Sequence, residues 1–214
     1  LKVSYLSKKF KEKNFCFSGG IFMNCLMNGK IEQKFKNLNF FIPFAPDDSG
    51  NSIGAALFLK KNILKHKGKI SNLNTSFLGP EYLNNQIEKE LNLSKIKYKK
   101  LKDVCNHAAI NLKQNKIIGW FQGKMEFGQR SLGNRSILAN PLDKNMKSKL
   151  NKSVKFRESF RPFAPTILYE YFNKFFENKR KDYSSPYMEK VYYIKEKYKK
   201  ILPAITHVDS SSRV

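Results

Sequence analysis

The chain has 214 residues, which is enough for one large or two small domains with a buried core. Hydrophobic residues make up 41% and aromatic residues 14%, a composition that argues against disorder. No apolar run approaches the ~18 residues that a membrane span needs, and no signal-peptide pattern opens the chain. The three cysteines are too scattered for a disulfide framework or a zinc-binding pair. We therefore expect a soluble, cytoplasmic protein without a membrane partner, in which the cysteines are small buried side chains.

The net charge of +24 comes mainly from lysine, because only six of the 41 basic residues are arginine. Such a charge is typical of nucleic-acid-binding proteins. The lysines are dispersed, however, and no RNP, KH or zinc-finger motif is present, so we interpret most of them as a solvated surface. A basic nucleic-acid-binding module is the alternative, and it predicts a steep salt dependence of binding to any polyanion.

Two strand, turn and helix units are predicted at the start of the chain. Residues 14–17 predict a strand, and a glycine turn leads into a helix over 21–27 that Gly29 would cap. Residues 39–44 predict a second strand, and the turn at 47–50 begins a second helix. This alternation is typical of α/β architecture.

The polar segment over 67–76 predicts a domain boundary. Beyond it we expect a helix that begins at Gly79, a helix that Asp103 caps, a buried strand over 117–121 and a short helix over 146–150. Toward the C-terminus the pattern weakens and assigns no element.

The arginines are concentrated where the glycines are. Arg130 and Arg135 lie in a glycine-rich loop after the buried strand, and Arg157 and Arg161 follow shortly after it. Guanidinium groups bind phosphate or carboxylate bidentately, and glycines let backbone amides approach a ligand. The pattern predicts anion binding, with a structural turn cluster as the alternative for the loop and a surface ion pair with Glu158 as the alternative for the second pair.

Several motifs resemble one family. The runs WFQGKMEFGQRSLGNRSIL and KFRESFRPFAP are similar to the C-terminal domain of the ATP-dependent O-carbamoyltransferases, the group that includes nodulation protein U and antibiotic carbamoyltransferases. The upstream motifs FSGG, DSG and FLGP and the later motifs SPYM and HVD are similar to further landmarks of that family.

The resemblance implies an α/β fold in two parts. Residues 1–76 would be the C-terminal part of an actin-like (ASKHA) ATPase domain, and residues 77–214 a YrdC-like α/β domain cut at its end. The implied reaction converts carbamoyl phosphate and ATP, with Mg²⁺, to carbamoyl adenylate and transfers the carbamoyl group to a hydroxyl of a sugar- or natural-product-like acceptor. A related alternative is a threonylcarbamoyl-adenylate-type tRNA modification enzyme. The sequence specifies no oligomeric state.

The implied site combines cations with backbone and small polar groups. The residues with an implied catalytic role are Arg130, Arg135, Arg157, Arg161 and His207. The residues with an implied role in binding nucleotide or carbamoyl phosphate are Gly19, Gly20, Asn24, Lys124, Gly128, Ser131, Gly133, Asn134, Ser136, Lys155 and Arg213.

The sequence departs from the family pattern at two points. Asp48 matches a metal-binding aspartate that in relatives holds a divalent metal, typically iron, together with an HxxxH pair. This chain has three separated histidines and no HxxxH, so Asp48 alone cannot hold the metal. Serines replace the Gly and Thr that commonly follow HVD, which leaves a structural or solvated His207 as the alternative to a catalytic one.

Overall fold

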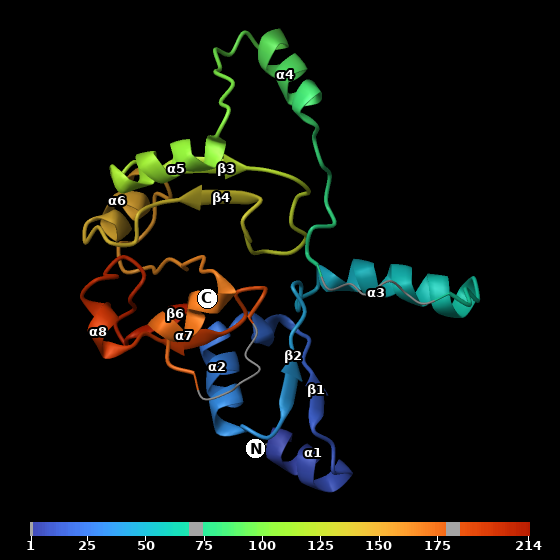
Figure 1. The fold of residues 1–214 in the computed structure, drawn as a ribbon. Helices are drawn as coiled ribbons and strands as arrows, with labels where there is room; N and C mark the ends of the chain where they lie inside the picture. Colours follow the sequence, from blue (N-terminus) through green and yellow to red (C-terminus); the bar gives the residue numbers. More distant parts are fainter. Residues whose placement is uncertain (1, 69–74, 179–184) are drawn as a thin grey trace.

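The computed structural model describes residues 2–68, 75–178 and 185–214. Over these ranges it shows a mixed α/β protein in which helices surround three two-stranded sheets (Figure 1). This confirms the expected α/β class. Within the described ranges no helix combines the length and the apolar character needed to cross a membrane.

The two strands expected near the N-terminus form one parallel pair. Strand β1 (Asn14–Cys16) pairs with β2 (Asn39–Phe41) after a first helix, α1 (Lys2–Phe10). Phe17 stacks on Phe22 at 4.5 Å between ring centroids and on Phe40 at 5.4 Å, which ties the pair to the turn that follows β1.

The glycine expected to end the first long helix lies inside it. A 3₁₀ turn (Gly20–Met23) leads into α2 (Cys25–Lys34), which continues past the buried Gly29. A Cβ at Gly29 would lie 2.9 Å from the carbonyl oxygen of Val191. The capping prediction is wrong because this glycine is needed for close packing of α2 on a C-terminal strand, and no local pattern reveals that contact.

Helix α3 (Gly50–Phe58), extended by a π-helical turn (Leu59–Ile63), confirms the helix expected after the 47–50 turn. Of the predicted boundary segment, residues 69–74 lie outside the described residues. Helix α4 (Asn84–Leu93) begins later than expected, because the N–H of Gly79 donates to the carbonyl of Met125 at 2.9 Å and holds the preceding segment extended. In Figure 1, α4 extends away from the other elements, and it buries no residue.

The middle of the chain forms a helix and a hairpin. Helix α5 (Val104–Lys113) begins as expected at Asp103, whose carboxylate accepts from the N–H of Asn106 at 2.9 Å. Strand β3 (Ile118–Phe121) pairs antiparallel with β4 (Arg135–Leu138). Strand β4 falls inside the segment that we expected to be a loop. The sequence did not indicate this strand, because its short apolar run directly follows glycine and arginine residues. Helix α6 (Met146–Ser153) confirms the short helix predicted there.

The C-terminal part, which the sequence pattern left unassigned, contains the largest described core. Strands β5 (Val191–Tyr193) and β6 (Ser211–Arg213) pair antiparallel, next to a 3₁₀ turn (Tyr169–Tyr171), α7 (Phe172–Phe175) and α8 (Glu196–Lys199). The buried side chains of this core are Phe172, Phe176, Tyr192, Ile194, Leu202 and Ile205.

The C-terminal part also packs on the N-terminal part. The side-chain amide of Asn28 donates to the carbonyl of Glu189 at 2.9 Å, and the buried Lys190 forms an ion pair with Glu32 at 2.9 Å. These contacts link α2 to the segment just before β5, so residues on both sides of the predicted boundary at 76 share one packed region.

The three cysteines are free thiols. Cys16 and Cys105 are exposed and Cys25 is half-buried, so the expectation of small buried side chains is wrong for two of them. Cys16 lies on the short strand β1, and Cys105 lies on α5, which buries only Ala108. Both side chains therefore face solvent.

Candidate functional site: an arginine cluster at the C-terminal hairpin

The glycine-rich loop lies against the N-terminal part of the chain. Gly128 has a φ of 104°, and a Cβ there would lie 2.6 Å from the carbonyl oxygen of Phe44. The next side chain, Gln129, donates to the carboxylate of Asp47 and to the hydroxyl of Ser49 at 3.2 Å. Hydrogen bonds from Ser49 and Gln129 hold the pKa of Asp47 below its ordinary value. These contacts position the next residue, Arg130, near the 3₁₀ turn before α2.

The amide groups of this loop bind a carboxylate of the chain itself. Oε1 of Glu126 accepts from the N–H groups of Leu132 and Asn134 at 2.8 Å each and of Arg135 at 3.3 Å. Burial would raise the pKa of Glu126, but these hydrogen bonds outweigh burial and lower it. The backbone amides that we expected to bind an anion are therefore already occupied by a carboxylate of the same loop. The backbone of the loop fits the alternative prediction, a structural turn cluster. Sequence reasoning missed Glu126, although it is the one carboxylate within the loop.

Arg135 and its neighbours hold the hairpin. Nη1 of Arg135 donates to the carbonyl of Gln122 at 2.7 Å, and the guanidinium lies 3.6 Å from the centroid of the Phe121 ring. The amide of Asn134 donates to the carbonyl of Lys124 at 2.7 Å. The hydroxyl of Ser136 accepts from the N–H of Gly133 at 3.1 Å and lies 3.2 Å from that of Ser131. These predicted site residues therefore form hydrogen bonds within the loop and hairpin.

Arg130 points away from the hairpin. Its guanidinium donates to the carbonyl of Met23 at 3.3 Å, and its side chain is half-buried. Burial lowers the pKa of Arg130, and the charge of Arg213 lowers it further. Met23 ends the 3₁₀ turn that leads into α2, so Arg130 joins the loop to the N-terminal part.

Arg157 lies in the segment after α6. Its Nε donates to the side chain of Asn151 at 2.8 Å, and its guanidinium lies 4.9 Å from the centroid of the Phe163 ring. Burial lowers its pKa, followed by the charges of Arg161 and Arg213. Arg161 itself is exposed and pairs with Glu158 at 2.7 Å, so the surface ion pair that was the alternative for this segment describes Arg161.

Arg213, on β6, acts electrostatically on both Arg130 and Arg157. Its charge lowers the pKa of Arg130, of Arg157 and of His207, which places it within electrostatic range of all three. We call Arg130, Arg157 and Arg213 the arginine cluster. The Nε of Arg213 and the hydroxyl of Ser212 are buried and have no hydrogen-bond partner among the described residues. Because each buried polar group without a partner costs about 1–3 kcal/mol, the cluster is suited to binding a ligand that accepts hydrogen bonds.

His207 lies at the edge of the cluster. Burial lowers its pKa most; the carboxylate of Asp209 and the backbone of Phe163 raise it, and Arg213 and Lys147 lower it. Its Nδ1 is 3.0 Å from the hydroxyl of Ser211, whereas its Nε2 is buried and has no hydrogen-bond partner among the described residues. The lowered pKa keeps the imidazole neutral at neutral pH.

The remaining predicted ligand-binding residues are two open glycines, a helix-capping asparagine and two exposed lysines. Gly19, with a φ of 108°, and Gly20 have open space above their Cα atoms. The side chain of Asn24 accepts from the N–H of Met27 at 3.0 Å and caps α2. Lys124 and Lys155 are exposed.

Asp48, the predicted metal ligand, is exposed. Nowhere in the described ranges do three or more His, Cys, Asp or Glu side chains come together as a group that could hold a metal ion. The residues present therefore do not fit the metal that the resemblance implies, and we assign no chemistry to it in this chain.

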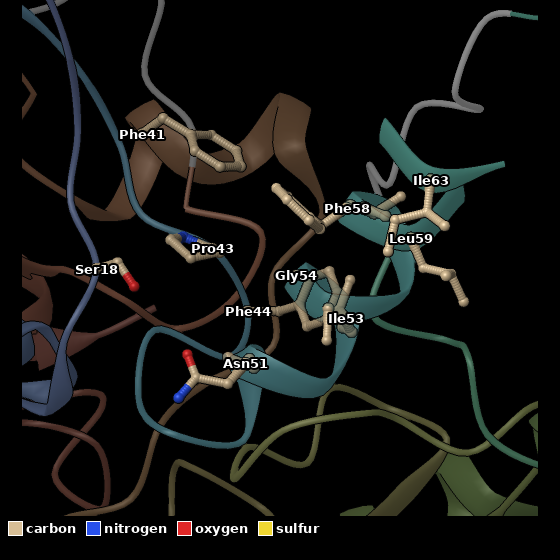
Figure 2. A pocket seen from close by; sticks show the side chains of 14 residues that line it. Ser18, Phe41, Pro43, Phe44, Asn51, Ile53, Gly54, Phe58, Leu59 and Ile63 are labelled. Atoms are coloured by element: carbon tan, nitrogen blue, oxygen red, sulfur yellow. The ribbon is translucent and has the colours of Figure 1, made fainter. Parts of the chain in front are cut away.

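A cavity of about 660 Å³ lies between the 41–45 segment and α3. Figure 2 shows Phe41, Pro43 and Phe58 around it, with Ser18 and Asn51 as polar side chains. Its lining contains no lysine or arginine. An apolar cavity of this kind suits an uncharged group, so the arginine cluster, not this cavity, offers the anion site.

Comparison with known proteins places this chain in one family. The model described as "Carbamoyltransferase N-terminus" matches residues 2–57, and "Carbamoyltransferase C-terminus" matches residues 109–214. The second match contains the whole arginine cluster, and the chain belongs to the carbamoyltransferase family.

Three relatives illustrate the match. An uncharacterized protein of Synechocystis sp. is 36% identical over 229 residues, covering 94% of this chain and 37% of the relative. Nodulation protein NolNO of Sinorhizobium fredii is 37% identical over 205 residues, covering 94% and 30%. Nodulation protein U of Rhizobium fredii is 32% identical over 202 residues, covering 94% and 32%. The chain thus spans about a third of the length of these relatives.

Proposed function

We propose that the protein takes part in ATP-dependent O-carbamoyl transfer and that the arginine cluster binds carbamoyl phosphate. The observation that carries this proposal is that the charge of Arg213 acts on both Arg130 and Arg157, which are half-buried, while a buried donor of Arg213 has no partner among the described residues. Like charges gathered in a partly desolvated site are stabilised when an anion binds between them. The carbamoyltransferase family supplies the kind of anion.

The proposed reaction has two steps. Carbamoyl phosphate, ATP and water give carbamoyl adenylate, phosphate and pyrophosphate. A hydroxyl of a sugar- or natural-product-like acceptor then takes the carbamoyl group and releases AMP. In the first step, negative charge develops on phosphoryl oxygens, and preorganised guanidinium donors stabilise charge where it forms. Mg²⁺ would accompany ATP, as it does in phosphoryl-transfer sites generally.

The proposal assigns different roles to the predicted residues. The cluster arginines would contact the phosphate, and Lys124 and Lys155, which are exposed, would neutralise nucleotide phosphates. The open backbone at Gly19 and Gly20 would let a nucleotide approach the turn before α2. An actin-like fold for residues 1–76, a YrdC-like fold for residues 77–214 and a cytoplasmic location remain parts of the proposal.

The test is ATP–pyrophosphate exchange that depends on carbamoyl phosphate. We expect exchange by the protein, and a decrease of at least about tenfold in Arg130→Ala, since a hydrogen bond to a charged group contributes about 1.5–3 kcal/mol. Lys100→Ala, which removes an exposed lysine paired with Glu88, is the matched control. Equal exchange in Arg130→Ala and wild type would contradict the assignment. Activity with bicarbonate and threonine in place of carbamoyl phosphate would favour the threonylcarbamoyl alternative.

A further inference from the structure

One buried side chain on α6 holds the segment that carries Arg157. Asn151 is completely buried, and its Nδ2 donates to the carbonyls of Ser159 at 3.2 Å and of Arg161 at 2.9 Å. Its Oδ1 accepts from Nε of Arg157 at 2.8 Å. The reversed amide would place its oxygen against two carbonyl oxygens, so these contacts determine that the oxygen faces Arg157.

The backbone of Asn151 adds a further contact. Its carbonyl accepts from the N–H of Arg157 at 3.0 Å. Hydrogen bonds to one residue therefore hold both ends of the 157–161 segment and one nitrogen of the guanidinium. Each polar atom of this buried side chain has a partner, which is the normal condition for a buried amide.

The guanidinium of Arg157 is fixed at two of its nitrogens. Besides the contact of Nε, Nη2 donates to the carbonyl of Pro162 at 3.4 Å, and the group lies 4.9 Å from the centroid of the Phe163 ring. Nη1 has no hydrogen-bond partner among the described residues. Nη1 is therefore the nitrogen that remains for a ligand.

Arg157 lines an open cavity whose charge favours an anion. The cavity has a volume of about 690 Å³, and its lining residues are Lys152, Phe156, Arg157, Glu158 and Arg161. Its one carboxylate, that of Glu158, pairs with Arg161 at 2.7 Å. Arg157 is the one cation of this lining that is half-buried, whereas Lys152 and Arg161 are exposed.

We infer that Asn151 is a positioning residue of the anion site and that it orients the guanidinium of Arg157 so that Nη1 donates to the phosphate of carbamoyl phosphate. This inference rests on the proposed function. An arginine side chain loses rotamer freedom when it binds a ligand, and a side chain that is already held loses less. Asn151 therefore raises the affinity for the phosphate through Arg157, without a contact of its own to the ligand.

The test is a double-mutant cycle on Asn151 and Arg157, with the dissociation constant for carbamoyl phosphate measured by calorimetry on the 214-residue chain. We expect Asn151→Ala to weaken binding about tenfold, because the ligand must then order a free Arg157 side chain. In the Arg157→Ala background the same substitution should weaken binding no further. A residue that only stabilises the fold would weaken binding equally in both backgrounds.

Asn145→Ala is the matched control. Asn145 is exposed at the start of α6, and its side chain makes no capping hydrogen bond, so this variant should bind carbamoyl phosphate as wild type does.

Two further measurements decide the question even where Asn151→Ala folds poorly. Arg157→Lys keeps the positive charge and leaves Asn151 bonded to Ser159 and Arg161, but it has no Nε–H for Asn151 to hold, so we expect about tenfold weaker binding. In wild type, the Nε–H of Arg157 should give a slowly exchanging NMR signal. Adding carbamoyl phosphate should shift the Nη signals and leave the Nε signal in place, because Asn151 keeps its hydrogen bond.

The outcomes separate this inference from the proposed function. The inference would be overturned by equal weakening in both backgrounds, by unchanged binding in Asn151→Ala or Arg157→Lys, or by a rapidly exchanging Nε–H of Arg157 in wild type. Each of these results leaves the proposed function in place if wild type binds carbamoyl phosphate. If wild type does not bind it, both proposals are overturned.

Discussion

The loop over 126–135 and the C-terminal segment over 207–213 both carry arginine and small residues, but they differ in how many of their buried hydrogen-bonding groups have partners. In the loop, the carboxylate of Glu126 accepts from three backbone N–H groups, and Nη1 of Arg135 donates to neighbouring carbonyls, although Nε of Arg135 is buried without a partner among the described residues. In the C-terminal segment, Arg213 and His207 each keep a buried nitrogen without a partner among the described residues. The comparison teaches that the backbone amides of the loop are satisfied by a carboxylate of the loop itself, whereas the C-terminal segment has more buried polar side-chain atoms that are available to a ligand.

The largest expected effect is on the loop. Glu126→Ala leaves three N–H groups without an acceptor, and we expect the free energy of unfolding to fall by about 3 kcal/mol, measured by urea denaturation. Glu126→Gln keeps an acceptor oxygen and is the matched control, with a smaller loss. If Glu126→Ala instead improved phosphate binding at unchanged stability, the loop would be a ligand cradle and the contrast between the two regions would fail.

Gly128 tests how the loop is docked. We expect Gly128→Ala to lose about 2 kcal/mol of stability, because it combines an unfavourable backbone angle with a clash against the carbonyl of Phe44. Gly133→Ala has a similar φ, 111°, with no atom within 4 Å of the added Cβ, so it isolates the cost of the backbone angle. Equal losses in the two variants would show that contact with the N-terminal part contributes nothing.

The two arginines of the loop should separate into different roles. Arg130→Ala should weaken binding of carbamoyl phosphate by about tenfold, or 1.4 kcal/mol, and change stability little. Arg135→Ala should lower the unfolding midpoint and leave affinity near that of wild type, because its guanidinium is engaged within the hairpin. Calorimetry and thermal denaturation on both variants check this, and the reverse pattern would exchange the two roles.

The smallest expected effect is a dependence of stability on pH. Burial holds the pKa of His207 below its ordinary value of 6.5, so the unfolded chain binds a proton that the folded chain does not. Stability should therefore be highest above pH 6.5 and fall as the pH decreases through that value. In His207→Leu this part of the pH dependence should be absent. Denaturant midpoints measured across this range, identical in shape for variant and wild type, would show that His207 is not buried in the neutral form.

Local patterns predicted the elements that local interactions form. The two N-terminal strands, the helix after the 47–50 turn and the helix capped by Asp103 all follow from short-range periodicity and capping. Strand β4 and the C-terminal strands were not predicted, because each is short and depends on a partner elsewhere in the chain. Gly29 shows the same limit, since its role depends on Val191.

The candidate site was predictable in its residues but not in its arrangement. The concentration of arginine around 130–161 pointed to anion binding, and the family resemblance added Arg213 and His207. No pattern showed that Arg130 would leave its own loop to reach Met23, or that Arg135 would stay in it. The hydrogen bond from Arg130 to Met23 spans 107 positions in sequence, and contacts of that range depend on how whole segments pack.

The most direct test of the arginine cluster is a double-mutant cycle on Arg130 and Arg213 with the affinity for carbamoyl phosphate as the readout. If both guanidiniums contact one bound anion and repel each other without it, the effects of Arg130→Ala and Arg213→Ala should be coupled by about 1 kcal/mol or more. Additive effects, or no effect of Arg213→Ala, would contradict a shared anion site.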